Sequence, residues 1–286
     1  MKRNKIATIV LTLVFLVGLS LLLYPTVSDF WNSFHQSRAI AQYASQVEEI
    51  DQENYERIWS AAVQYNRTLL DNPDRFTMTE EEKAEYESLL SVSDLGIMGY
   101  IEIPEIDCSL PIYHGTDEAA LQIAIGHLEG SSLPVGGKGT HCVLSGHRGL
   151  PSAKLFTNLD QLTEGDLFYL KILDETLTYE VDQILTVDPY DLRALEIDPE
   201  QDYCTLVTCT PYGINTQRLL VRGHRVETAD LSSDVRVTAD AMQVDPMFLV
   251  PLAVIPLLLL LFVGLLAGRR RRRHSGPPGP GRRKDG

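Results

Sequence analysis

The sequence predicts a mostly β domain, built as a barrel or a sandwich, between two apolar segments long enough to cross a membrane. Two observations lead to this prediction. After residue 92 the chain contains about seven short runs rich in Val, Ile, Leu, Thr and Tyr, separated by turn-forming residues. Near each end of the chain, an uncharged apolar run is flanked on its outer side by Lys and Arg.

The two apolar segments are residues 6–24 and 247–267, which are 19 and 21 residues long and carry no charge. As a helix, either one spans roughly 30 Å of hydrocarbon. Basic residues lie outside both of them, at positions 2–5 and in five consecutive arginines at 269–273. The positive-inside rule therefore predicts that both termini are cytoplasmic and that the chain between the segments is extracytoplasmic. A cleaved signal peptide is the alternative for the first segment.

The charge of the chain is segregated in the same way. The chain has 25 basic and 39 acidic residues, yet residues 24–246 hold 14 basic and 38 acidic residues, a net charge of −24. A body this acidic repels phosphate backbones, so nucleic-acid binding is disfavoured. The acidity either attracts basic partners or simply keeps the domain soluble.

Local patterns predict the individual elements. Apolar residues recur every three to four positions from about 29 to 70, which indicates an amphipathic helix or helix pair that ends at Asn72-Pro73-Asp74. A short helix is expected at 80–90, with Thr79 as its N-cap, and another at 117–125. Strands are expected at 99–103, 110–114, 141–145, 167–173, 177–187, 203–209 and 218–226.

These elements divide the chain into consecutive parts with different roles. The expected parts are a cytoplasmic end (1–5), a transmembrane helix (6–24), a helical extension (25–91), the β domain (92–228), a linker (229–246), a second transmembrane helix (247–267) and a basic cytoplasmic tail (268–286).

Three chemically useful side chains occur at the ends of predicted strands. Cys209 ends the strand in TLVTCTPYG, His147 closes another in SGHRG, and Arg218 opens the strand that follows the cysteine. A Cys–His pair supplies a thiolate nucleophile and a general acid, and a fixed guanidinium stabilises a developing oxyanion. Taken singly, each residue has an ordinary explanation as a core thiol, a surface histidine or a surface ion-pair partner. Their shared placement favours a catalytic group.

The remaining cysteines and histidines indicate no metal site. No CxxC pair occurs, and no histidine has metal-like spacing near a cysteine, so we expect neither a metal nor a cofactor. Cys142 lies five residues before His147, and Cys204 five before Cys209. If their strands are parallel neighbours, the two thiols share a level in the sheet, either bonded as a disulfide or buried and unpaired.

Taken together, these motifs resemble those of the sortases, the cell-surface transpeptidases of Gram-positive bacteria. The resemblance covers about residues 92–228 and rests on TLVTC, on SGHRG and on the arginine nine residues after the cysteine. The run GSSLPVGGKGTHCVLSGHRGLPSAKLF and the run TCTPYGINTQRLLVRGH are similar to the pilus-specific class C subgroup. The implied fold is an eight-stranded β-barrel with short helices, an N-terminal helical extension carrying a lid, and two transmembrane helices.

The resemblance also implies an activity. Cys209 would attack an LPXTG-like sorting signal between Thr and Gly and hold the product as a thioacyl enzyme. His147 would protonate the leaving amine and deprotonate the incoming one, while Arg218 would stabilise charge. The acceptor would be a lysine amine on another pilin. Ser145 and Thr208, beside the two motifs, are candidate substrate contacts.

Class C sortases usually carry a lid, an Asp-Pro-aromatic segment that precedes the barrel. The matching stretch here is residues 72–76, in which Asp74 and Phe76 fit the pattern and Arg75 replaces the proline. Losing the proline predicts a less rigid lid. We expect Asp74 to face Arg218 and Phe76 to sit against Cys209. An ordinary turn between helices is the alternative.

Other functions are compatible with parts of this pattern. A sortase of another class would anchor single proteins to the cell wall. A cysteine protease would use the same acyl enzyme with water as acceptor. A membrane-tethered adhesin or scaffold would use Cys209 and His147 only structurally. The two apolar segments and residues 72–76 favour the pilin-polymerising enzyme.

Overall fold

The computed structural model describes residues 2–92 and 96–228. The predicted linker, second transmembrane helix and basic tail, residues 229–286, therefore lie outside the described part. Within it, one helix contains an apolar stretch long enough to cross a membrane, and this stretch lies near the N-terminus.

Three helices precede the barrel, at the places where helical periodicity predicts them. Asp51 is the N-cap of the second helix, and its carboxylate accepts a hydrogen bond from the Asn54 N–H at 2.9 Å. The third begins with a capping box, in which Thr79 and Glu82 satisfy each other's backbone N–H groups. The helices are α1 (Lys2–Glu48), α2 (Gln52–Leu69) and α3 (Glu80–Ser88).

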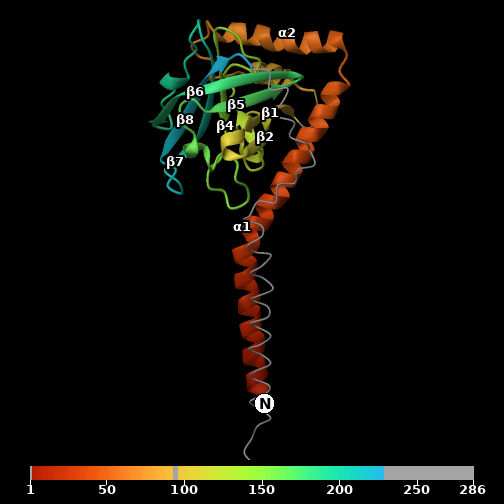
Figure 1. Cartoon of the computed structure of the whole chain (residues 1–286), viewed down its shortest axis with the longest axis vertical. Helices are drawn as coiled ribbons and strands as arrows, with labels where there is room; N and C mark the ends of the chain where they lie inside the picture. Colours follow the sequence, from red (N-terminus) through yellow and green to blue (C-terminus); the bar gives the residue numbers. More distant parts are fainter. Residues whose placement is uncertain (1, 93–95, 229–286) are drawn as a thin grey trace, which may run out of the picture. The chain divides into compact units, whose positions relative to one another are not determined.

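Eight strands form a closed barrel in the order β1-β2-β3-β4-β7-β8-β6-β5 (Figure 1). The structure thus selects a barrel over a sandwich. The strands are β1 (Ile97–Ile103), β2 (Cys108–His114), β3 (Ile125–His127), β4 (Thr140–Ser145), β5 (Leu167–Ile172), β6 (Glu175–Val187), β7 (Asp202–Thr210) and β8 (Gln217–Val226). The connections contain helix α4 (Glu118–Leu121) and the 3-10 turns η1 (Pro104–Ile106), η2 (Leu159–Gln161) and η3 (Arg193–Leu195).

One expected helix is shorter than predicted. Of the helix expected at 117–125, only α4 forms, and the chain then enters β3. Strand β3 pairs in parallel with β2 and antiparallel with β4. Its three residues are completely buried, so tertiary pairing overrides the local helical pattern.

Strand alternation sorts the residues of β4, β7 and β8 between the barrel interior and its outer face. The interior positions belong to the main core: Cys142, Leu144, Cys204, Leu206, Leu219 and Val221. The positions between them belong to a second apolar cluster on the outer face, here called the outer cluster, which includes Val143, Val207 and Leu220. The outer face of these three strands is therefore a covered apolar surface.

One buried tyrosine attaches the end of α1 to the barrel. The Tyr43 hydroxyl donates to the Met98 carbonyl oxygen at 3.0 Å and accepts from the Leu173 N–H at 2.8 Å. Tyr43 is fully buried, so both backbone groups depend on this hydroxyl.

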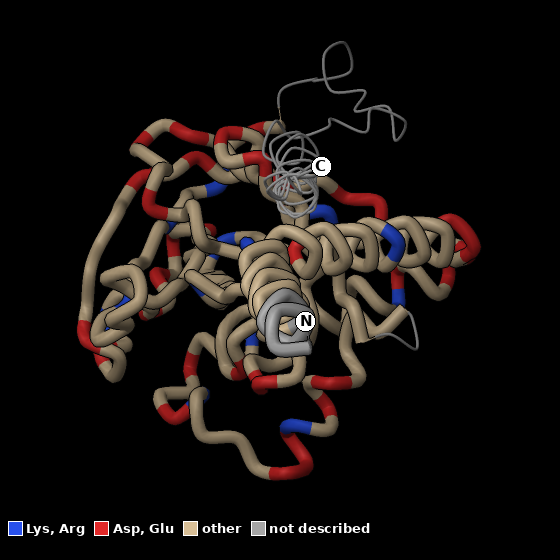
Figure 2. Tube along the Cα trace, turned by 90° about the horizontal axis from the view of Figure 1, so that it is seen from below, with Lys and Arg blue, Asp and Glu red and all other residues tan. Residues whose placement is uncertain are grey.

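Acidic residues greatly outnumber basic ones along the described chain. Figure 2 shows Asp and Glu spread over many of the loops, with Lys and Arg far fewer. The strongly negative charge predicted for residues 24–246 is thus distributed rather than gathered in one patch.

Candidate active site

The predicted catalytic residues lie at one end of three adjacent strands, β4, β7 and β8. Strands β4 and β7 are parallel, and Ser145 pairs with Val207. The pairing continues past the end of β4, because the Gly146 N–H donates to the Val207 carbonyl oxygen at 3.0 Å. In this register, two residues beyond Ser145 and Val207 are His147 and Cys209. These two residues therefore lie at the same level, where their strands end.

Cys209 and Arg218 are direct partners across antiparallel strands. Their Cα positions are paired in the β7–β8 ladder, so their side chains lie on the same face of the sheet. This is the outer face, since Cys209 follows Val207 at an interval of two residues. Cys209 is a free, half-buried thiol, and Arg218 is half-buried as well.

The backbone before His147 is held tightly. The Thr208 hydroxyl donates to the Gly146 carbonyl oxygen at 2.7 Å. Gly146 leaves no space for a side chain, because a Cβ there would lie 2.7 Å from Cδ2 of Phe156. The Phe156 N–H in turn donates to the His147 carbonyl oxygen at 3.1 Å. The imidazole is thereby attached to rigid backbone.

The imidazole itself is less constrained. Nε2 of His147 is enclosed but has no hydrogen-bond partner among the described residues. The carboxylate of Glu118 lies close to the ring, with 3.9 Å between Nε2 and Oε2. Glu118 opens α4 and is 74% exposed. This neighbour has no local sequence signal, because 29 positions and two strands separate Glu118 from His147.

Arg218 keeps most of its hydrogen-bonding capacity free. Its Nη1 donates to the carbonyl oxygens of Asn215 and Gln217, at 3.4 and 3.1 Å. It forms no ion pair with the described residues, so the rest of the guanidinium is available for a carbonyl or an oxyanion.

The two expected substrate contacts occupy different environments. Ser145 is half-buried on the outer face at the end of β4. Thr208 is 1% exposed, because it points to the barrel interior and binds Gly146. The structure gives Thr208 a positioning role, holding β7 against the backbone that carries His147.

The segment at 72–76 lies against the same outer face. Phe76 packs on the outer cluster, together with Val207. Arg75 is buried and donates to the carbonyl oxygens of Gly130 and Leu195, at 2.9 and 2.8 Å. Its guanidinium also stacks 4.2 Å from the centroid of the Phe76 ring.

Arg75 therefore has a role that the sequence analysis did not foresee. Replacing a proline removes a restriction on φ, and we expected a looser segment for that reason. The guanidinium instead ties the segment to two distant backbone carbonyls. The close approach of Arg75 to residue 130 requires a glycine there, since a Cβ would lie 2.1 Å from the Arg75 carbonyl oxygen. Asp74 is exposed and makes no ion pair with Arg218 in the described part of the chain.

Comparison with known proteins agrees with this arrangement. The profile of the Sortase domain family matches residues 101–226. The chain is 54% identical to sortase C1 from Streptococcus agalactiae, over 67% of this chain and 100% of that one, with a TM-score of 0.65. The chain belongs to the sortase family. A sortase C from Streptococcus pneumoniae is 45% identical, over 67% of this chain and 97% of that one, with a TM-score of 0.61.

The similarity to these two enzymes places the sortase in class C of a family of cysteine transpeptidases. Sortase D from Bacillus subtilis is 33% identical over 131 residues, which is 45% of this chain. The match spans 63% of the length of that relative.

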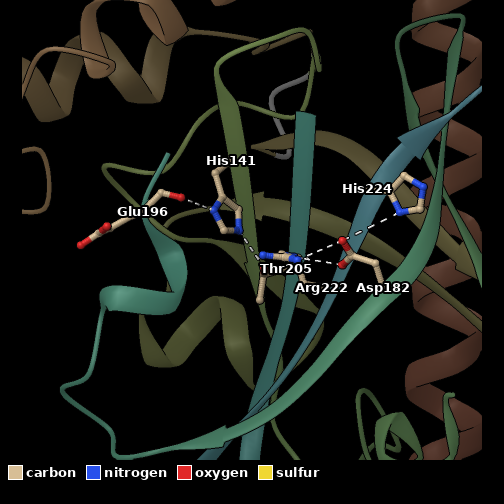
Figure 3. Close-up of polar contacts among 6 residues, drawn as sticks. All are labelled: His141, Asp182, Glu196, Thr205, Arg222 and His224. Carbon is tan, nitrogen blue, oxygen red and sulfur yellow. Dashed lines mark hydrogen bonds and ion pairs between the residues drawn. The ribbon is translucent and has the colours of Figure 1, made fainter. Parts of the chain in front are cut away.

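A second polar cluster lies farther along the outer face of the sortase barrel (Figure 3). His141 bonds to the Glu196 carbonyl oxygen through Nδ1 at 2.8 Å and to the Thr205 hydroxyl through Nε2 at 2.7 Å. Arg222 donates to both carboxylate oxygens of Asp182, at 2.9 and 3.0 Å. Burial lowers the pKa of His141 to about 4, so this imidazole is neutral and structural.

The other cysteines of the sortase lie inside the barrel. Cys142 and Cys204 are paired in the parallel β4–β7 register, as their equal spacing predicts, and both are buried free thiols. No cluster of three or more His, Cys, Asp or Glu side chains within residues 2–92 and 96–228 has the arrangement of a metal site.

Proposed function

We propose that this sortase cleaves an LPXTG-like sorting signal between Thr and Gly and transfers it to a lysine amine of a pilin, so that pilins are joined covalently. Cys209, His147 and Arg218 are the proposed catalytic residues. The observation that carries the proposal is their register: Cys209 lies opposite Arg218, and His147 leaves the adjacent parallel strand at the same level.

In the first half-reaction, the Cys209 thiolate attacks the carbonyl carbon of the substrate threonine. The Arg218 guanidinium stabilises the oxyanion that develops on the carbonyl oxygen. The C–N bond to glycine then breaks, and His147 gives its proton to the leaving amine. The product of this step is a thioester on Sγ of Cys209.

In the second half-reaction, the lysine amine attacks the thioester carbonyl. His147 accepts a proton from the attacking nitrogen, and the C–S bond breaks to release the Cys209 thiolate. The new amide is an isopeptide bond between two pilins. Ser145, half-buried on the same face, is a proposed substrate contact.

Two relatives support the choice of substrate. A sortase C from Clostridium perfringens, 42% identical to this chain, was solved with the C-terminal cell wall sorting motif. The Streptococcus pneumoniae enzyme is described in terms of pilin substrate specificity. In this chain such a peptide would react at the strand ends that carry Cys209, His147 and Arg218.

We also propose that Asp74, Arg75 and Phe76 form a lid over the site. Phe76 packs on the outer cluster that includes Val207, and Val207 precedes Cys209 on the same face of β7. A sortase from Corynebacterium diphtheriae, 43% identical, was studied as a lid mutant. In this chain the lid would be held by the two hydrogen bonds of Arg75.

The proposed enzyme is held in the cell membrane with its catalytic domain outside. The apolar N-terminal part of α1 supports one anchor. The uncharged run at 247–267, with five arginines after it, supports a second anchor and cytoplasmic termini.

Incubation of the full-length enzyme with a pilin that carries a sorting signal tests the function. The native enzyme should produce a ladder of high-mass pilin products that survives denaturation. Cys209→Ala should abolish the ladder, while Cys108→Ala, outside the site, should leave it intact. Wall-attached monomers without a ladder would indicate a sortase that anchors single proteins. No dependence on Cys209 would contradict the proposal.

A further inference from the structure

Helix α1 is attached to the loops at the catalytic end of the barrel. Oδ1 of Asp29 accepts a hydrogen bond from the Lys154 N–H, and Nδ2 of Asn32 donates to the Ser152 carbonyl oxygen, both at 2.8 Å. Ser152 and Lys154 belong to the connection that His147 begins. The first turns of α1 after its apolar stretch therefore bind the loop that carries the proposed general acid.

Farther along, α1 reaches the opposite end of the barrel. Tyr43 accepts from the N–H of Leu173, which lies in the turn between β5 and β6. Strand β6 begins at this turn and ends at Val187, which pairs with Arg218 at the catalytic end. The turn therefore lies at the end of the barrel opposite the catalytic residues. Going from residue 29 to residue 43, α1 thus runs from the catalytic end toward the far end.

The apolar stretch of α1 must then lie beyond the catalytic end. The uncharged run ends at Tyr24, and Asp29 is the first charged residue after it. Five residues of continuous helix rise by about 8 Å. The aromatic residues Phe30, Trp31 and Phe34 are more than half exposed on the same turns, as is typical of a membrane–water interface.

We infer that the catalytic end of the barrel faces the membrane that α1 enters and rests on its surface. The inference uses the membrane anchoring of the proposed function and adds an orientation to it. Cys209 opens toward the lipid interface rather than toward bulk solvent or the cell wall.

Two exposed apolar side chains provide the contact. Tyr212 is 60% exposed and Ile214 is 67% exposed, and both lie in the connection after Cys209. This connection lies beside the loop of His147, because a Cβ on Gly149 would be 3.0 Å from the Tyr212 ring. The exposed side chains of Tyr212 and Ile214 therefore lie at the same end of the barrel as the turns of α1 that carry the exposed aromatic residues.

The contact is apolar rather than electrostatic. Among the charged residues of the described loops, Asp and Glu outnumber Lys and Arg, so attraction to anionic headgroups is weak overall (Figure 2). A tyrosine and an isoleucine instead gain free energy by leaving water for the interface.

Lipid quenching of tryptophan fluorescence tests the orientation in the full-length enzyme in nanodiscs. Only Trp31 and Trp59 occur in the chain, and both can be changed to Phe. Tyr212→Trp then reports on the catalytic end. A second variant, Trp31→Phe, retains Trp59 alone and reports on the far end. Trp59 stacks on Tyr55, whose hydroxyl lies 3.5 Å from Glu175 at the start of β6.

Lipids brominated near the headgroup should quench the indole at position 212 several-fold more than Trp59, and added salt should not reduce the difference. Equal, weak quenching of the two reporters would overturn the inference. Quenching only at high protein density in the disc would also overturn it, because a second copy of the chain would then cover this end. Ile214→Trp gives an independent reporter if the first variant does not fold.

The outcome is separable from the catalytic proposal. Quenching does not require activity, so absence of pilin products would leave the orientation test intact. Normal pilin ladders with weak quenching at both reporters would reject the orientation alone.

Discussion

Two clusters on the outer face of the same three strands have similar residues and different chemistry. Each combines a histidine from β4 or its end, a residue of β7 and the arginine paired with that residue on β8: His147, Cys209 and Arg218 in one, and His141, Thr205 and Arg222 in the other. In the second cluster every one of these side chains has a close partner. In the first, the imidazole and most of the guanidinium are unbonded.

The difference shows what separates a catalytic cluster from a structural one. Both clusters have a histidine, an arginine and the same three strands, so these shared features do not decide the matter. Satisfied polar groups in a buried position stabilise the fold, whereas unsatisfied groups at half-buried strand ends are free to bind a reacting substrate. Substitutions at matched positions therefore test the assignment.

The largest expected difference is between the two histidines. His147→Ala should lower kcat/KM for transpeptidation by about 10²- to 10⁴-fold, because it removes the general acid, and should leave Tm almost unchanged. His141→Ala should keep the rate within a few-fold and lower stability by about 1–3 kcal/mol, since it leaves two polar groups unpaired. Initial rates and thermal melts measure both. Equal rate losses would remove the distinction between the clusters.

The paired arginines give the next largest contrast. Arg218→Lys should reduce kcat/KM by about 10²- to 10³-fold, because an ammonium does not reproduce the planar donor set at the oxyanion. Arg222→Lys should act on Tm instead, since it breaks the two-point contact with Asp182. A normal rate for Arg218→Lys would show that charge alone is sufficient at this position.

The buried imidazole predicts a dependence of stability on pH. Burial holds the pKa of His141 at about 4, below its usual value near 6.5. Between these values the unfolded state binds more protons than the folded state, so stability falls as the pH is lowered through this window, by up to about 3 kcal/mol. His141→Gln should flatten that part of a Tm-against-pH curve. An unchanged slope would place the acid sensitivity elsewhere.

The smallest expected effect concerns the lid. Arg75→Ala removes two hydrogen bonds from a charged donor, each worth about 1.5–3 kcal/mol. A loss of about 1.4 kcal/mol from the closed state is enough to raise the fraction of open lid tenfold. Cys209 should then react with a small thiol reagent about tenfold faster, and Phe76→Ala should also accelerate the reaction. Arg67→Ala, on the exposed side of α2, is the control. Unchanged kinetics in both lid variants would argue against a lid.

Much of the arrangement follows from local sequence patterns. Strands β6 and β7 were predictable because long alternating runs specify both their type and their buried face. Helix α3 was predictable from Thr79 and Glu82, whose capping signal acts within one turn. Cys209, His147 and Arg218 were identifiable because each lies where a strand ends or begins, and strand ends are visible in the sequence.

Other features depend on distant partners and were not predictable. Strand β3 is extended only because β2 and β4 pair with it on both sides. The sequence shows Arg75 only as the loss of a proline, because its acceptors are backbone carbonyls of Gly130 and Leu195 and carry no side-chain signal. The same is true of the bond from Asn32 of α1 to the loop after His147, which determines the proposed orientation at the membrane.

The most direct test of the central claim is the mass of the enzyme during turnover. Full-length enzyme mixed with an LPXTG-like peptide, in the absence of a lysine acceptor, should gain the mass of the acyl fragment on Cys209 alone. Hydroxylamine should remove the adduct, because thioesters are cleaved by this nucleophile, and His147→Ala should slow its formation. No adduct, or an adduct on Cys108, Cys142 or Cys204, would contradict the assignment of Cys209 as the nucleophile.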